Sequence, residues 1–106
     1  MTAVQLVVVT LRSRRKLLPN AAQISEYVWA TAQPEDHLEH VRVSKPTEAG
    51  KVNLALYVLA ADQGEAARLA GGLVKRMTRT VRALKGAHVQ SVKNPEIPGA
   101  PGTVST

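Results

Sequence analysis

The chain has 106 residues, with 14 Lys or Arg against 8 Asp or Glu and a formal net charge of +6 at pH 7. This length fits one domain with one hydrophobic core, and the positive charge favours an anionic partner such as nucleic acid, anionic lipid or an acidic protein. The lack of cysteine excludes disulfide bonds, a thiol nucleophile and thiolate metal ligands. No stretch reaches the roughly 20 apolar residues of a membrane span, and the apolar residues 4–11 precede their basic cluster, unlike a secretory signal. We therefore expect a cytoplasmic protein without a membrane span.

The N-terminal part predicts a strand followed by a helix. Residues 3–11 are rich in β-branched types and apolar at both alternating positions, which is typical of a central strand covered on both sides. A basic loop, residues 12–16, separates this strand from the helix. Asn20 is a suitable N-cap and Gln23 occupies the reciprocal capping position, so the helix begins there and ends near Thr31.

Two further strands follow, joined by a turn. Residues 38–44 alternate, with valines on one face and His40 and Arg42 on the other, as expected for an exposed edge strand. Residues 45–50 have the composition of a turn. Residues 52–61 are again apolar on both faces and predict a second central strand.

The longest predicted element is an amphipathic helix. It begins at Asp62, which can act as the N-cap with Glu65 at the third position, and Gly86 marks its end. Gly71 and Gly72 lie inside it and predict either a bend or a close packing contact. One face is apolar, and the opposite face is cationic: Arg68, Lys75, Arg79 and Arg82.

A short strand over residues 87–93 completes the order β-α-β-β-α-β. This order predicts a ferredoxin-like α+β fold, with a four-stranded antiparallel sheet in spatial order 4-1-3-2 and two helices on one face. We expect one domain over residues 1–93. Residues 94–106 are rich in Pro and Gly and predict a flexible C-terminal tail.

In this topology, the loop after the first strand, the central hairpin and the end of the second helix meet at one end of the sheet. The cations of these segments predict a site for an anion or an acidic partner: Arg12, Arg14, Arg15, Lys16, Lys45, Lys51, Arg79, Arg82 and Lys85. Most acidic residues would lie at the opposite end: Glu35, Asp36, Glu39, Asp62 and Glu65. The alternative interpretation is that several of these charges only oppose the dipoles of the helix ends.

The face of the sheet without helices predicts an oligomer interface. Its expected residues are apolar: Val7, Val9, Ala55, Tyr57 and Leu59. Because soluble proteins seldom leave such a patch in water, we expect a homo-oligomer, with a dimer favoured, although a ligand pocket on this face is an alternative.

Candidate catalytic and metal-binding residues are few. His37 and His40 lie near acidic residues, but they occur where a loop enters a strand, so their side chains would point to opposite faces, and His88 has no evident partner. We expect no metal and no cofactor. An interaction or accessory module without catalytic activity is the leading hypothesis.

Two other functions stay open. A nucleic-acid-binding protein would contact phosphates through the basic loop and the second helix, although the central strands offer only Tyr57 for base stacking. A small cofactor-free enzyme would need an apolar pocket lined by Trp29 or Tyr27.

Overall fold

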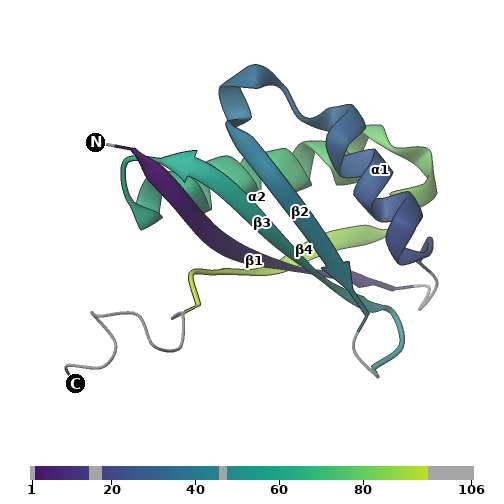
Figure 1. The fold of residues 1–106 in the computed structure, drawn as a ribbon. Coiled ribbons are helices and arrows are strands. Elements are labelled where there is room, and N and C mark those ends of the chain that lie inside the picture. The colour runs from purple at the N-terminus through teal and green to yellow at the C-terminus, as the bar shows by residue number, and fades with distance from the viewer. Residues whose placement is uncertain (1, 15–17, 46–47, 96–106) are drawn as a thin grey trace.

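The structure is a computed structural model that describes residues 2–14, 18–45 and 48–95. Its elements are β1 (Ala3–Ser13), α1 (Ala21–Thr31), the 3-10 turn η1 (Pro34–Asp36), β2 (Leu38–Ser44), β3 (Lys51–Ala60), α2 (Gln63–Thr80), the 3-10 turn η2 (Arg82–Leu84) and β4 (Ala87–Lys93). The strands form one antiparallel sheet in the order β2-β3-β1-β4 (Figure 1). This is the predicted order counted from the other edge, so the α+β class and the strand order are confirmed.

Both helices begin at the caps that the sequence predicts. The Asn20 carboxamide oxygen accepts a hydrogen bond from the Gln23 amide at 2.8 Å, and the Gln23 side chain accepts one from the Asn20 amide at 3.2 Å. At α2, Asp62 Oδ1 accepts from the Glu65 amide at 2.8 Å. These bonds satisfy backbone donors that the first helical turn leaves without partners.

Helix α2 ends earlier than predicted. It stops at Thr80, and Val81 has extended backbone angles, so the expected end at Gly86 was wrong. The hydroxyl of Thr80 donates to the Arg76 carbonyl at 2.8 Å, and the hydroxyl of Thr78 donates to the Lys75 carbonyl at 2.8 Å. Such bonds from β-branched hydroxyl residues compete with regular helix bonding, and the chain continues into η2 instead.

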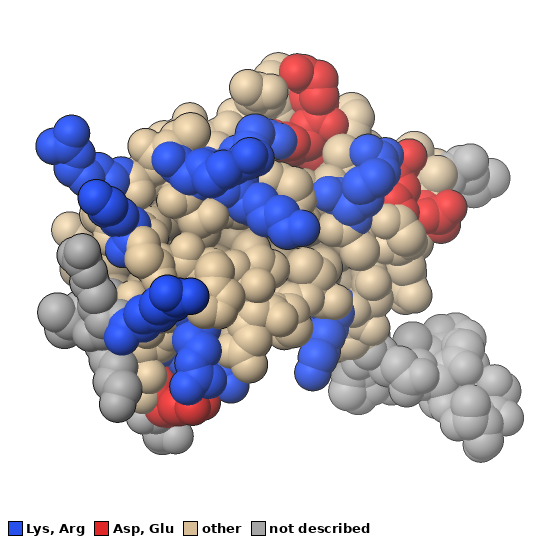
Figure 2. Space-filling model, turned by 180° about the vertical axis from the view of Figure 1, so that it is seen from behind, with Lys and Arg blue, Asp and Glu red and all other residues tan. Residues whose placement is uncertain are grey.

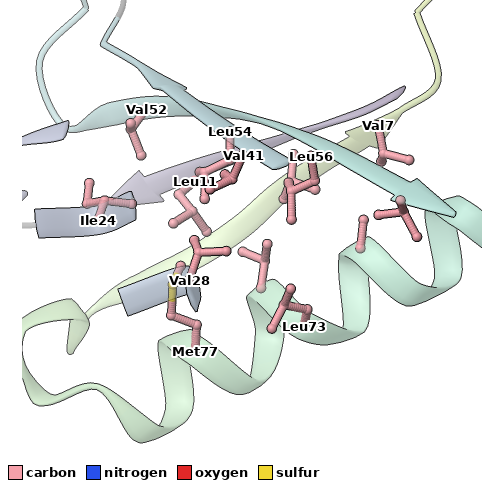
Figure 3. Packing of buried hydrophobic residues seen from close by; sticks show 14 of the residues in the cluster. Val7, Leu11, Ile24, Val28, Val41, Val52, Leu54, Leu56, Leu73 and Met77 are labelled. Carbon is pink, nitrogen blue, oxygen red and sulfur yellow. The ribbon is translucent and has the colours of Figure 1, made fainter. Parts of the chain in front are cut away.

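The hydrophobic core lies between the sheet and the two helices, which cover the same face of the sheet (Figures 1 and 3). Alternate residues of the central strands point into it: Val7, Val9, Leu11, Val52, Leu54, Leu56, Val58 and Ala60. Helix α1 contributes Ile24 and Val28, and α2 contributes among others Leu73 and Met77. All of these side chains are at most 1% exposed.

The prediction that Val7 and Val9 lie on the uncovered face was wrong. Both are 0% exposed and point toward the helices, opposite Leu56 and Leu54 of β3. The cause is the two-residue period of a strand: β1 is apolar at both sets of alternating positions, so periodicity could not select the face. Leu6 and Val8 take the predicted place on the uncovered face.

Helix α2 lies close to β4 at Gly71, which is buried. A Cβ atom at Gly71 would stand 3.4 Å from a methyl group of Val92, whereas one at Gly72 would meet nothing within 4 Å. Helix α2 continues through both residues. A methyl group would therefore make an ordinary van der Waals contact at Gly71 and no contact at Gly72, so close packing does not require glycine at either position.

Candidate interaction surfaces

The uncovered side of the sheet carries an apolar patch, which we call the open face. Three cross-strand pairs form it: Val4 with Leu59, Leu6 with Tyr57, and Val8 with Ala55. Val4 is 53% exposed, and the other five side chains are partly exposed. Of the five predicted interface residues, Ala55, Tyr57 and Leu59 lie on this face.

Aromatic contact extends the open face toward the β2 edge. The rings of His40 and Tyr57 have centroids 5.6 Å apart at an interplanar angle of 42°. Beyond Val8 and Ala55, the same face becomes polar, and Thr10 Oγ1 donates to Asn53 Oδ1 at 2.9 Å. The apolar and polar halves of the open face therefore follow each other along β1 and β3.

Three chain segments meet at the end of the sheet where the sequence predicts a basic site. The Ser13 amide donates to the Gly50 carbonyl at 2.8 Å, and the Arg14 amide donates to the Gly86 carbonyl at 3.4 Å. Gly50 and Gly86 have positive φ angles of 78° and 93°, which turn the chain at these points. The end of β1, the β2–β3 hairpin and the connection before β4 thus lie together.

Two of the cations at this end are already paired. Glu48 is 3.1 Å from Lys51 and 3.7 Å from Arg12. The hydrogen bond and charge of Lys51, followed by the charge of Arg12, lower the pKa of the exposed Glu48 carboxyl. The i,i+3 spacing of Glu48 and Lys51 was a visible signal of this pairing.

The remaining predicted cations differ in their surroundings. Lys45 Nζ donates to the Leu18 carbonyl at 3.4 Å. Arg15 and Lys16 lie outside the described residues. Arg14, Arg79, Arg82 and Lys85 are exposed, and no ion pair joins them to another residue in the described ranges.

A groove of about 420 Å³ runs between α2 and β4. Its lining combines α2 residues with β4 residues: Lys75, Thr78, Arg79, Ala87, His88 and Val89. The sequence around it is free of carboxylates, since residues 66–95 contain neither Asp nor Glu. Figure 2, seen from behind the view of Figure 1, shows Lys and Arg side chains spread across this side, with acidic side chains toward its upper, right and lower left margins.

At the predicted acidic end, one carboxylate is buried and paired. Asp36 is 5% exposed, and its Oδ2 lies 2.5 Å from Arg76 Nη2 and accepts from the Gln33 amide at 2.8 Å. Sequence reasoning missed Arg76 because nothing distinguishes it from the neighbouring cations of α2. The pair joins η1 to α2, which are 40 positions apart in the chain.

A second hollow, of about 440 Å³, lies beside the end of α1. Trp29, His37 and Glu39 are among its lining residues, and all three are exposed. It brings an aromatic side chain near two polar groups but does not enclose them. His37 and His40 do not combine into a metal site, because no group of three His, Asp or Glu side chains in the described part of the chain is placed to hold an ion.

Among the residues that the structure describes, no helix is long and apolar enough to cross a membrane. Comparison with known proteins adds no relative: no family model, no curated protein and no solved structure matches this chain. Its function must therefore be argued from its surfaces.

Proposed function

We propose that this protein is a cytoplasmic, ferredoxin-like interaction module without catalytic activity. It self-associates through the open face and presents the basic end of the sheet, where the end of β1, the β2–β3 hairpin and the connection before β4 meet, to an acidic partner. The observation that carries the proposal is the apolar half of the open face, where three cross-strand pairs of apolar residues lie in contact with solvent. Covering such a surface stabilises an assembly by about 25 cal/mol for each Å² of apolar area removed from water.

A second copy of the chain fits this face because the basic residues Arg12 and Lys51 lie at one end of the sheet, away from the apolar half of the open face. In a two-fold dimer both subunits use the same patch. A two-fold axis that lies between the two sheets, perpendicular to the strands near Leu6 and Tyr57, places the apolar halves together and directs the basic ends, with Arg12 and Lys51, to opposite sides. Like charges are thereby kept apart, which an overlap of the polar halves would not achieve.

The mass of the particle in solution tests the proposal. We expect light scattering with size-exclusion chromatography to give twice the chain mass of 11.4 kDa for the wild type, and Tyr57→Lys to give a single chain mass. Trp29→Lys is the matched control, since Trp29 is 46% exposed but lies on α1, away from the open face. A wild type that stays monomeric at high concentration contradicts self-association.

The acid-free stretch 66–95 supports a second candidate, a nucleic-acid-binding protein that contacts phosphates. Its binding would weaken steeply with added salt and would fall when Arg14 and Arg15 are both changed to Glu. Binding of random single-stranded DNA that is unaffected by this reversal excludes the basic loop as the phosphate site.

A further inference from the structure

The outer edge of β4 is the starting observation. β4 is the last strand of the sheet, and its pairing with β1 is the only strand pairing it makes within the described residues. An edge strand of this kind leaves backbone amides and carbonyls along its outer side that an added strand can pair with.

The groove between α2 and β4 lies beside the first three residues of this edge. Ala87 and Val89 contribute its apolar part from β4 and are partly exposed, and Lys75 and Arg79 border it from α2. An added strand beside β4 would cover the two apolar side chains. It would also direct every second side chain toward the two cations, because alternate residues of a strand point to the same face.

The opposite face of β4 carries one further cation. Lys93 is exposed and pairs with Val8 of the open face. Neither Lys75 nor Arg79 forms an ion pair with any residue in the described ranges. The groove side of an added strand would therefore meet two cations without an ion pair in the described ranges, and its other side would meet Lys93.

We propose that the β4 edge and its groove bind an extended acidic peptide segment, which adds to the sheet as a fifth strand. This inference rests on the acidic partner of the proposed function and names its site and its conformation. Backbone pairing with β4 supplies the register, and carboxylates facing Lys75 and Arg79 supply the selectivity. The same cations oppose edge-to-edge pairing with a second copy, because two β4 edges would bring positive charges together.

The probe is a fluorescein-labelled peptide of seven residues, the length of β4, that alternates threonine and glutamate. Fluorescence anisotropy with the full chain should show saturable binding. The double change Lys75→Glu and Arg79→Glu should weaken it at least about tenfold, since it replaces two attractions with two repulsions. A control protein with Arg42→Glu and Arg68→Glu has the same net charge and leaves the groove intact, since Arg42 lies on β2 at the opposite edge of the sheet, so it should bind nearly as the wild type does.

Backbone pairing is tested with two further peptides of the same sequence, one N-methylated at its threonine amides and the other at its glutamate amides. Each keeps every carboxylate but loses the backbone donors of one strand edge, so we expect the peptide blocked on the edge that faces β4 to bind at least about tenfold more weakly. Equal binding of all three peptides overturns strand addition. An equal loss of affinity in the groove and control variants overturns the assignment to this groove.

A single-stranded oligothymidylate provides the last arm. If it binds more tightly than the acidic peptide and displaces it, the surface serves phosphates and the inference is wrong. Light scattering on the same samples separates this outcome from failure of the proposed function: a dimer that does not bind the peptide overturns only the groove, and a monomer that binds it contradicts only self-association.

Discussion

Removing Arg76 should destabilise the fold by leaving a buried carboxylate without its counter-ion. Asp36 has a side chain only 7% exposed, whereas the Arg76 side chain is 34% exposed. Breaking a fully buried pair costs about 3–5 kcal/mol, and breaking an exposed one costs about 0–1 kcal/mol. Because water reaches one partner and the Gln33 amide still binds Asp36, we expect Arg76→Met to lower the free energy of unfolding by about 2 kcal/mol.

Methionine is chosen because it retains much of the aliphatic stem of arginine, so lost packing contributes little. Urea unfolding of the wild type, Arg76→Met, Asp36→Asn and the double variant gives the coupling energy between the two side chains. All four are compared at one protein concentration, since self-association would shift apparent stability. A coupling below about 0.3 kcal/mol would mean that the two sites act independently and would refute this reasoning.

Two smaller changes test other parts of the structure. Gly72→Ala should raise the free energy of unfolding by about 1 kcal/mol in urea unfolding, because alanine is the better helix former and its methyl group meets nothing within 4 Å. Gly71→Ala should gain at least as much, since its methyl group would stand at an ordinary van der Waals distance, 3.4 Å, from Val92; a loss of stability would show that α2 and β4 are too close for a methyl group. For Glu48, the lowered folded-state pKa means that its contribution to stability is complete above the unfolded-state pKa and is lost as pH falls through the folded-state pKa. NMR titration of its carboxyl should show the pKa rising in Lys51→Met, and an unchanged pKa would show that Lys51 is not the cause.

Local signals predicted most of the fold. The Asn20 and Gln23 caps, the whole of β2 and the whole of β4 follow from residue types that act on their immediate neighbours. Strand order followed from the alternation of elements together with the two strands that are apolar on both sides. These features need no knowledge of which residues meet across the sheet.

Predictions that depended on distant contacts were less successful. The inward face of β1 could not be selected, because Leu6 and Val8 are as apolar as Val7 and Val9. Pairing of Asp36 with Arg76 depends on where η1 packs against α2, which no local pattern encodes. The basic end was located through topology, and the sequence places Glu48 there as its one acidic residue, but the approach of Arg12 to Glu48 depends on where the end of β1 meets the hairpin.

The hydrogen bond between Thr10 and Asn53 has a consequence for how the chain avoids misfolding. A register slip of one residue that turns β1 over would exchange its inward and outward rows of side chains. Both rows of β1 consist largely of valine and leucine, so apolar contacts alone barely oppose this slip. The slipped state would, however, separate this polar pair and turn one member toward the interior without its partner. The hydrogen bond between these two polar side chains thus favours the native register of the central strands, which apolar contacts alone would not select.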